Sequence, residues 1–456
     1  MQNGVKIVIH ALIVTFLFLY SDFFIGCEIS IYKGILFFML ILYIATFFKN
    51  AKYIYLLIAS LGFIHHIFFS YFKRIMTSAD VYNFFTHVEE TFETLFALQS
   101  LFILSISLFL AILVILWFLN RVKIKKYSLL KWIKYPLLSL LLFINLNSSM
   151  GLKIIDVIFS LPKNTTMKIE YNEIPLYPVR ENDINIILIL GESMKYDNYV
   201  EQKLKKQGHF YKKIYAGATN TDISLPLLLN AKNNTLKLKP NNQTNLFKLA
   251  KKSNFKTAFI SMQSENSLRY IKPYLQLNHV DNYKSFKKEV QKPKFDFFLL
   301  DELEKFDFSQ KSFLVFQQIG QHSPYKFFDG EKSKIPSVNY QKSVNYSFEL
   351  YSQIYTHLKQ KKKPFILIYT SDHGEFSGEN GRYGHNSFDP VIYEVPMFIT
   401  SNTTLPNNYK LIDSHYKLSQ FLIYLLGYNK ELIFENEQNI INGTMITRED
   451  GFIIID

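Results

Sequence analysis

The stretch PFILIYTSDHGEFSGENGRYGH, residues 364 to 385, decides the fold. It opens with an apolar run, continues into the adjacent Asp372 and His373, and reaches a second histidine, His385, through several glycines. A carboxylate and an imidazole side by side are costly to bury unless a cation, commonly a metal ion, takes up their lone pairs. The stretch therefore indicates a ligand site at the end of a buried β-strand.

After residue 184 the sequence contains further apolar runs of the same kind. Short apolar runs alternate there with polar stretches long enough to hold helices. The alternation predicts an α/β domain whose largely parallel sheet is covered by helices on both faces. The runs are INIILIL (184–190), FKTAFIS (255–261), SFLVFQQ (312–318), PFILIYT (364–370) and VPMFIT (395–400).

Potential metal ligands follow three of these runs. Glu192 follows the first, His322 the third, and Asp372 and His373 the fourth. Ligands gather at the carboxyl ends of parallel strands, so we expect these groups to meet, with His385 delivered by the glycine-rich loop. A single acid after a strand is most often a helix cap, but five such groups favour a metal site. Carboxylates and imidazoles without a thiolate favour zinc, with manganese second.

The stretch YAGATNTDISLPLLLNAKN (215–233) supplies a candidate nucleophile. Thr221 stands in a small-residue turn before a predicted helix, where threonine is also common as an N-cap. The two roles are compatible, because the free N–H groups of a helix N-terminus can bind a phosphate carried by the hydroxyl. A divalent cation would lower the pKa of that hydroxyl, as it does for water.

Apolar residues are concentrated before residue 150, in five runs. A helix of about 20 apolar residues crosses the roughly 30 Å hydrocarbon layer, and we interpret all five runs as transmembrane helices. A buried helical bundle is the alternative. The first run could also be a signal peptide, but it lacks a small-residue cleavage site. The runs are 5–25, 32–48, 53–71, 97–119 and 131–147.

Basic residues predict the orientation. Lys49 and Lys52 lie between the second and third runs, and six further basic residues lie around the link between the fourth and fifth. Both links should be cytoplasmic, which puts the N-terminus inside and the chain after about residue 148 outside. The six are Arg121, Lys123, Lys125, Lys126, Lys131 and Lys134.

Three domains follow from this organisation. Residues 1–147 form the predicted transmembrane domain, 148–183 an amphipathic bridging helix with a linker, and 184–456 the outer domain. Residues 1–147 carry +6 of the net charge of +13, so the remainder is also basic, which suits an anionic lipid surface. Nucleic acid is the competing partner for a basic chain, but an outer domain seldom meets it.

The single cysteine, Cys27, lies at the edge of the first predicted span, which leaves the outer domain without disulfides.

Four blocks resemble the signatures of the membrane phosphoethanolamine transferases, which modify lipid A and lipooligosaccharide and belong to the sulfatase-like alkaline phosphatase superfamily. The resemblance covers the whole chain. It implies a multi-pass protein of the bacterial inner membrane with five N-terminal helices and a periplasmic α/β sandwich. The blocks are GES (191–193), TNTDISLP (219–226), GQHSP (320–324) and SDHGEFSGENGRYGH (371–385).

The resemblance also implies roles for individual residues. Thr221 would carry phosphoethanolamine from phosphatidylethanolamine to lipid A or another periplasmic glycan, in a protein that acts as a monomer. His322 and His385 would bind a second zinc ion or the substrate phosphate. The zinc ligands would be Glu192, Thr221, Asp372 and His373.

Other functions stay open. A phosphoglycerol transferase or a phosphodiesterase of the same superfamily is the main alternative, and a non-catalytic membrane scaffold is another. A sulfatase is disfavoured, because the Cys/Ser-x-Pro-x-Arg motif that generates its nucleophile is not found in the sequence.

The chain departs from the family pattern in two respects. Well-known members have disulfides in the periplasmic domain, one of them beside the nucleophile turn. The family's polar substrate motif between the third and fourth spans is only loosely matched by YNFFTHVEETFE (82–93). Asn83, Thr86 and Glu90 are the best match, with Glu89 or Glu93 as alternatives to Glu90. An amphipathic interfacial helix is the competing interpretation of this stretch.

Overall fold

The computed structural model falls into two compact units, each described by itself. The first comprises Met1–Thr165 with Asn380–Arg382, and the second Thr166–Glu379 with Tyr383–Asp456. The described residues are 2–26, 30–77, 80, 81, 84, 88–122, 124–146, 148–159, 176–207, 210–233, 238–286, 295–429, 444–448 and 451–455.

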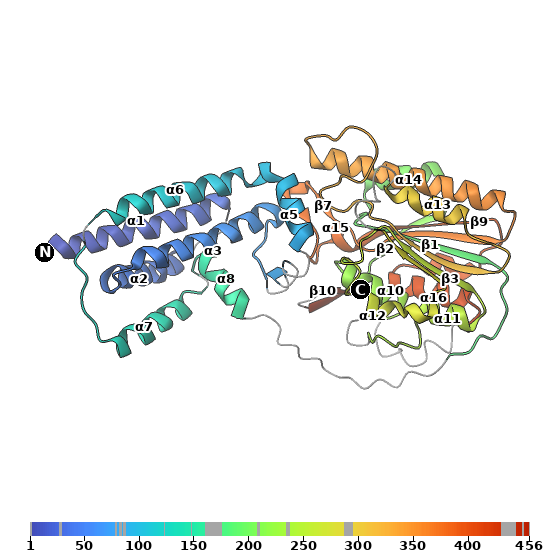
Figure 1. Ribbon diagram of the computed structural model, residues 1–456, viewed down its shortest axis with the longest axis horizontal. Coiled ribbons are helices and arrows are strands. Elements are labelled where there is room, and N and C mark those ends of the chain that lie inside the picture. The colour runs from blue at the N-terminus through green and yellow to red at the C-terminus, as the bar shows by residue number, and fades with distance from the viewer. Residues whose placement is uncertain are drawn as a thin grey trace. The chain divides into compact units, whose positions relative to one another are not determined.

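The first unit is helical (Figure 1). Each of the five predicted apolar runs forms a helix, and α1 packs against α2, α3 and α6. The elements are α1 (Gln2–Ile25), α2 (Ile31–Phe47), α3 (Ala51–Phe72), α5 (Val88–Ala97), the 3-10 helix η1 (Gln99–Phe102), α6 (Ile103–Asn120), α7 (Lys131–Ile144) and α8 (Met150–Phe159).

Among the described residues, three helices are long and apolar enough to cross a membrane: Asn3–Ile25, Ala51–Phe72 and Gln99–Asn120. Helix α2 is apolar but shorter, with 17 residues. Helix α7 has 14 residues, begins with Lys131 and contains Pro136. At 1.5 Å per residue it spans about 21 Å, short of the roughly 30 Å hydrocarbon layer. The predicted count of five spans therefore stays a prediction.

A buried group in the first unit, the Asp22 cluster (Asp22, His65, His66), joins three helices. His66 Nε2 lies 2.7 Å from Asp22 Oδ1, and the backbone N–H of Met150 donates to Asp22 Oδ2 at 3.0 Å. His65 Nε2 accepts from the Met76 N–H at 3.1 Å, so its Nδ1 donates to the Met150 carbonyl, also at 3.1 Å. Both histidines hydrogen-bond within the helical unit, and the cluster holds the first turn of α8 against α1 and α3.

The second unit is built on a seven-stranded sheet, in the order β2-β9-β6-β1-β5-β3-β4 among the described residues. The five strands from β6 to β4 in this order are parallel. Strand β9 runs antiparallel to β6, and β2 runs antiparallel to β9, so β2 has the same direction as the five. The strands are β1 (Asn185–Gly191), β2 (Phe210–Tyr215), β3 (Lys256–Ser261), β4 (Asn282–Ser285), β5 (Ser312–Gln317), β6 (Phe365–Ser371) and β9 (Glu394–Ser401). Two small antiparallel pairs join β7 (Phe376–Ser377) with β8 (Tyr383–Gly384), and β10 (Thr444–Arg448) with β11 (Gly451–Ile455).

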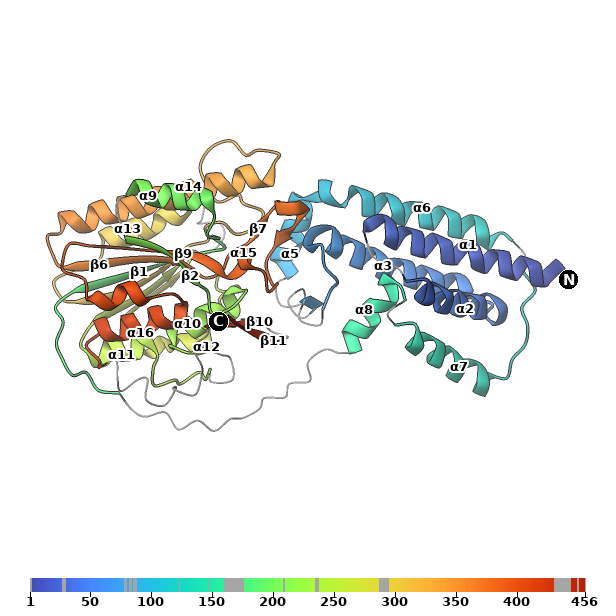
Figure 2. The ribbon, with the colours of Figure 1, turned by 180° about the vertical axis from the view of Figure 1, so that it is seen from behind.

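Helices cover both faces of the sheet. Helices α9, α13 and α14 lie on one face and α10, α11, α12 and α16 on the other, as Figures 1 and 2 show from opposite sides. The bounds are α9 (Asn198–Gln207), α10 (Thr221–Leu229), α11 (Leu246–Lys252), α12 (Lys272–Leu275), α13 (Phe298–Glu304), α14 (Pro336–Gln360), α15 (Pro390–Tyr393), α16 (His415–Leu425) and the 3-10 helices η3 (Leu277–His279), η4 (Phe295–Phe297), η5 (Glu379–Gly381) and η6 (Asn407–Leu411).

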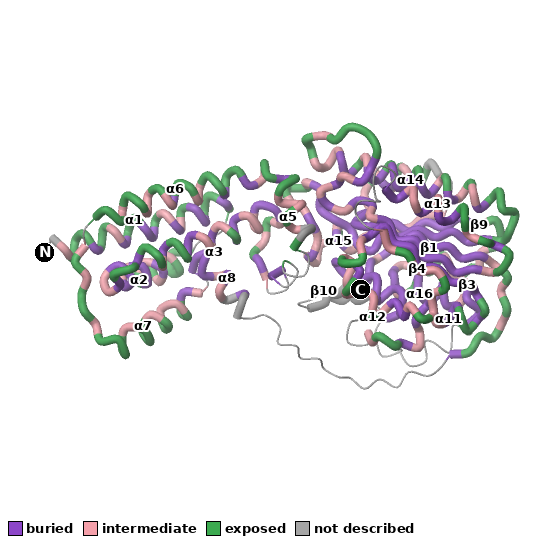
Figure 3. The backbone as a smooth tube through the Cα atoms, in the orientation of Figure 1, coloured by how far each residue is buried: buried purple, intermediate pink, exposed green. Residues whose placement is uncertain are grey.

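The core of this unit has two halves, one on each side of the sheet. Ile186 and Leu188 of β1 pack into one half, and Ile187 and Ile189 pack into the other. This follows from the two-residue period of a strand, and it explains why β1 is apolar throughout. Figure 3 shows the central strands buried between the helical layers. The predicted α/β fold with a doubly covered, largely parallel sheet is confirmed.

Candidate metal centre

The register of β1 and β6 brings the predicted ligands together. These neighbouring strands are parallel, and Gly191 lies opposite Ser371. The next residue of each strand is therefore an acid, Glu192 or Asp372, and both leave the sheet at its carboxyl edge. With His373 they form the metal-ligand cluster (Glu192, Asp372, His373), whose three ligand atoms are buried and lie within 4.8 Å of one another.

Backbone contacts orient two of the ligands. Asp372 Oδ1 accepts from the backbone N–H groups of Ser193 at 3.0 Å and His373 at 2.8 Å, which leaves Oδ2 for the centre. His373 Nδ1 lies 2.9 Å from the Gly374 carbonyl and must donate to it. Its Nε2 is then an unprotonated acceptor. Outer contacts of this kind fix the tautomer and orientation of metal ligands.

The charges in this cluster do not balance. His373 Nε2 lies 3.6 Å from Glu192 Oε1 and 3.5 Å from Asp372 Oδ2, so three acceptor atoms converge. Burial, and then the charge of Asp372, raise the pKa of Glu192 well above its usual range. A divalent cation would satisfy all three acceptors, and two oxygens with one imidazole nitrogen fit zinc or manganese.

Thr221 is the first residue of α10 and points into the cluster. Its Oγ1 lies 2.5 Å from Asp372 Oδ2 and 3.3 Å from both Glu192 Oε2 and His373 Nε2. The capping role falls instead to Asn220, whose side chain accepts from the Ile223 N–H at 3.1 Å. The threonine hydroxyl is thus a potential nucleophile and ligand, and the half-buried residue remains accessible from solvent.

The two predicted loop histidines differ in their placement. His385 follows β8, and its ring centroid lies 4.4 Å from that of His373. His322 lies after β5, with Nδ1 2.6 Å from the Ser323 carbonyl. Its loop is anchored where the Gln321 N–H donates to the Glu192 carbonyl at 3.2 Å. Both histidines are half-buried, unlike the three ligands beneath them.

Gln263 belongs to the site but was not among the predicted residues. It follows β3, is 8% exposed, and its Nε2 donates to Glu192 Oε2 at 2.6 Å. Gln263 and Asp372 approach the Glu192 carboxylate from opposite sides. Gln263 follows β3 and Asp372 follows β6, and these strands lie on opposite sides of β1 in the sheet. The signal that predicted Glu192, a polar residue just after an apolar strand, applies to Gln263 as well.

The predicted membrane-side substrate residues cannot be placed with the others. Asn83 and Thr86 lie outside the described residues. Glu90 and its alternative Glu89 belong to α5, but only their backbone is described, and Glu93 lies in the same helix. Helix α5 agrees with the helical part of the competing interpretation, and the substrate role stays a prediction.

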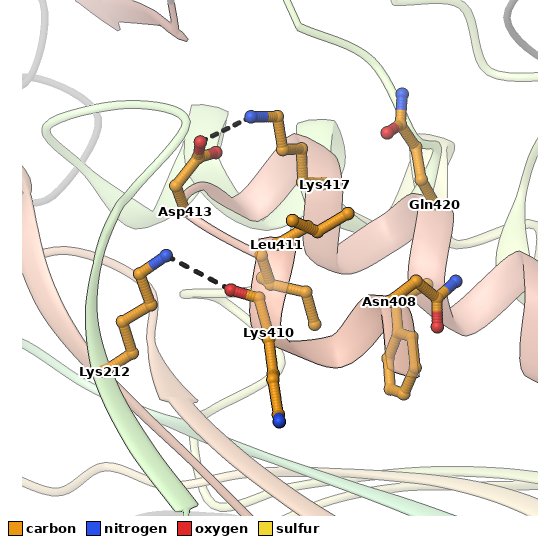
Figure 4. Close-up of a pocket in the computed structure, with 9 residues that line it drawn as sticks. Lys212, Asn408, Lys410, Leu411, Asp413, Lys417 and Gln420 are labelled. Carbon is orange, nitrogen blue, oxygen red and sulfur yellow. Dashed lines mark hydrogen bonds and ion pairs between the residues drawn. The ribbon is translucent and has the colours of Figure 1, made fainter. Parts of the chain in front are cut away.

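A separate surface hollow of about 370 Å³ lies beside α16 and the outer edge of β2. Figure 4 shows how its lysines are engaged: Lys417 pairs with Asp413, and Lys212 Nζ donates to the Lys410 carbonyl at 3.4 Å. The second contact links η6 to the edge strand β2, whereas the first is local to the start of α16, and we assign the hollow no catalytic role.

Together, the fold and the cluster define an enzyme class. A doubly covered sheet with an acid after each of two adjacent strands, and a threonine at a helix N-terminus beside them, fits a hydrolase or transferase that uses a hydroxyl nucleophile. The family model "Sulfatase" matches residues 184–428, which is more than half of the chain. The chain belongs to the sulfatase family.

Similar proteins make the assignment within the sulfatase family more specific. The chain is 22% identical to phosphoethanolamine transferase EptA of Helicobacter pylori over 287 residues, 55% of this chain and 54% of that protein, so it spans about half the length of this curated relative. Among solved structures it is similar to the integral membrane lipooligosaccharide phosphoethanolamine transferase A of Neisseria meningitidis. That match has a TM-score of 0.57 and 14% identity, and covers 93% of this chain and 96% of the other. The predicted relationship to the membrane phosphoethanolamine transferases is confirmed.

Proposed function

We propose that this protein is a zinc-dependent phosphoethanolamine transferase that moves phosphoethanolamine from phosphatidylethanolamine to lipid A or a related surface glycolipid. One observation carries the proposal: Thr221 Oγ1 lies 2.5 Å from Asp372 Oδ2, at a helix N-terminus and against three potential metal ligands. A hydroxyl held in this way has the setting of an activated nucleophile. The similarity to EptA proteins supports the choice of phosphoethanolamine as the transferred group.

The residues divide into two sets. Glu192, Asp372 and His373, with Thr221, would hold one zinc ion tightly, because two sheet strands fix the positions of the acids. When bound, zinc would lower the pKa of the threonine hydroxyl and offset the charge of the carboxylates. His322 and His385 would hold the substrate phosphate or a weaker second ion. The N–H groups in the first turn of α10 would also face the phosphate oxygens.

The reaction proceeds in two displacements at phosphorus. Thr221 Oγ1 first bonds to the phosphorus of phosphatidylethanolamine while the bond from phosphorus to the glycerol oxygen breaks. Diacylglycerol leaves with the proton that the threonine hydroxyl gives up. An O–H group of the acceptor then bonds to the same phosphorus, the bond to Thr221 breaks, and the acceptor's proton restores the hydroxyl.

We further propose that the chain is a monomeric, multi-pass protein of the bacterial inner membrane. Its transmembrane domain would comprise residues 1–147, followed by the bridging segment 148–183 and a periplasmic catalytic domain, 184–456. The long apolar helices support this arrangement. Near the membrane, Asn83, Thr86 and Glu90 would contact the donor lipid.

A test of this function compares two donors on the purified full-length protein. After incubation with phosphatidylethanolamine or phosphatidylglycerol, mass spectrometry should find phosphoethanolamine on Thr221, and only with the first donor. Thr221→Ala should carry no adduct and transfer nothing, whereas Thr221→Ser, the matched control, should keep part of both. Full transfer by Thr221→Ala would exclude the nucleophile, and a phosphoglycerol adduct would establish the alternative donor.

The acceptor needs a separate measurement. Mass spectrometry of surface glycolipids from cells with and without the gene should reveal a phosphoethanolamine-bearing species that depends on the gene. Its fragmentation would identify the acceptor as a lipid A phosphate, a core sugar or another glycan. Identical glycolipid profiles in the two strains would exclude a glycolipid acceptor.

A further inference from the structure

His415 is a buried imidazole behind Thr221, at the first position of α16, and only 1% of it is exposed. The backbone N–H of Gly217 donates to its Nδ1 at 3.3 Å. Its proton is therefore on Nε2, which donates to the Ser371 carbonyl at 3.0 Å. Gly217 begins the turn that leads to Thr221, and Ser371 directly precedes Asp372. The ring thus touches both segments that place the nucleophile and its nearest carboxylate.

Ser224 adds a second link between the same segments. Its hydroxyl lies 3.2 Å from His415 Nδ1 and donates to the Asp372 carbonyl at 2.6 Å. Ser224 lies one turn after Thr221 in α10 and is fully buried. The turn before α10 is therefore joined to the end of β6 through the imidazole, and α10 itself is joined to Asp372 through one serine hydroxyl.

The charge state of His415 suits a fixed tautomer. Burial lowers its pKa to about 4, so the ring is neutral at physiological pH. A neutral imidazole has one donor and one acceptor nitrogen, and both have backbone partners here. Residues 184–456 contain no cysteine, so no disulfide can fix the Thr221 turn. The turn is held by non-covalent contacts, including one from Asn220 Nδ2 to Asn386 Oδ1 at 2.9 Å.

We propose that His415 is a positioning residue that keeps the Thr221 hydroxyl in line with Asp372. The ring holds the Gly217 and Ser371 backbones at a set separation, and the 2.5 Å approach of Thr221 Oγ1 to Asp372 Oδ2 depends on it. This role rests on the proposed function, in which Thr221 is the nucleophile. Misplacement of a reacting group by about 1 Å can cost on the order of a hundredfold in rate.

The test compares variants of the full-length protein in detergent. His415→Phe keeps a ring but loses both hydrogen bonds, and His415→Asn keeps an acceptor for the Gly217 N–H. Ser419→Ala is the matched control, because Ser419 lies one turn further along α16 and its hydroxyl bonds only backbone carbonyls, of Leu228 at the far end of α10 at 2.7 Å and of His415 at 2.8 Å, and not the imidazole. For each variant, kcat and KM are measured with p-nitrophenyl phosphoethanolamine, alongside bound zinc and Tm.

The expected result separates positioning from stability. His415→Phe should lower kcat about 10- to 100-fold, in line with a misplaced nucleophile, while KM and bound zinc change less than about twofold. His415→Asn should recover part of the lost kcat. Ser419→Ala should lower Tm but leave kcat unchanged, because it loosens the end of α10 away from Thr221.

Other results would overturn the proposal. An unchanged kcat in folded, zinc-loaded His415→Phe, with only Tm reduced, would make His415 an ordinary core histidine. If His415→Phe does not fold, His415→Asn decides: a reduced kcat with retained KM and zinc supports the role, and an unchanged kcat refutes it. Thr221→Ala is measured in the same series to separate the role of His415 from the proposed function. Activity in this variant would refute Thr221 as the nucleophile, but it would not bear on the hydrogen bonds of His415.

Discussion

The Asp22 cluster and the metal-ligand cluster are built from the same residue types, yet their hydrogen bonding differs. In the Asp22 cluster one carboxylate meets a histidine nitrogen and a backbone N–H, so each oxygen has a protein partner. In the metal-ligand cluster two carboxylates face an imidazole nitrogen whose lone pair points at them. The carboxylate oxygens of both clusters have protein donors, but the second cluster brings two carboxylates and an unprotonated nitrogen within 4.8 Å of one another, and a cation or a proton would offset this excess of negative charge.

The number of buried acids around one imidazole therefore distinguishes the two clusters, and the mere presence of acids and histidines does not. Burying two carboxylates side by side is costly, so a site that retains them is arranged for a cation. An Asp–His pair in a sequence is consistent with either outcome. The count of acids per imidazole, and the partner of the second ring nitrogen, decide between them.

The largest expected effect comes from removing a ligand of the metal-ligand cluster. Asp372→Asn and His373→Ala should each lose bound zinc and reduce transfer to background, because the remaining acceptors no longer form a complete coordination set. Elemental analysis of the purified variants, beside their transfer rates, measures both effects. A variant that retains stoichiometric zinc would contradict this assignment.

The loop histidines should behave differently. His322→Ala and His385→Ala should each cut turnover about 10²- to 10³-fold, as expected when a charge-stabilising group is lost. Both variants should keep close to one zinc per chain, because neither residue belongs to the buried cluster at the carboxyl ends of β1 and β6. If His385→Ala loses all its zinc, the division between a tight site and a substrate-side pair is wrong.

The Asp22 cluster should affect stability alone. Asp22→Asn weakens the contact with His66, and leaving buried polar groups poorly paired costs about 1–3 kcal/mol. We expect a lower Tm in detergent, with bound zinc and turnover per folded molecule unchanged. Loss of zinc in this variant would remove the distinction between the clusters.

Asp296 is a buried acid that belongs to neither cluster. Its titration should give the smallest of the effects predicted here, on the free energy of unfolding. Its oxygens accept from the backbone N–H groups of Ile319 at 2.8 Å and Gly320 at 3.0 Å, and burial raises its pKa to about 7. An unfolded aspartate has a pKa of about 3.9, so the folded protein binds the extra proton between these values. The unfolding free energy should therefore fall as pH rises through this window, by about 1 kcal/mol between pH 6 and 7, and level off above 7.

The control for this pH dependence is Asp296→Asn, which cannot titrate. The difference in Tm between pH 6 and 7 should be smaller in this variant than in the unmodified protein, even though its Tm is lower at both values. An equal pH dependence in the two proteins would mean that Asp296 is ionised throughout this range.

Much of the fold could be predicted because its central strands are apolar throughout. The five apolar runs became β1, β3, β5, β6 and β9. The strands β2 (FYKKIY) and β4 (NYKS) were not predicted, since each is an edge strand whose residues are mostly only partly buried and include polar side chains. The antiparallel direction of β9 could not be inferred either, because a buried strand is apolar in both orientations.

The site was partly predictable for a related reason. Glu192, Asp372 and His373 stand directly after apolar runs, so strand-end reasoning brings them together. His415 opens a helix, and its contact with Gly217 joins residues 198 positions apart, which no local pattern encodes. The run 131–147 became α7, Lys131–Ile144, whose first turns contain Lys131, Lys134 and Pro136, and its role as a span stays a prediction.

Strand β1 lies in the middle of the sheet although it is the first strand in chain order. The contact from the Ser193 N–H to Asp372 Oδ1 joins residues 179 positions apart. At 5–20 residues per second, the ribosome needs about 10–35 s to make that interval. The growing chain therefore presents Glu192 and Thr221 long before Asp372 and His373 exist. On the proposed function, ion binding would follow the synthesis of β6, and a polypeptide interrupted before that strand would carry only half of the ligand set.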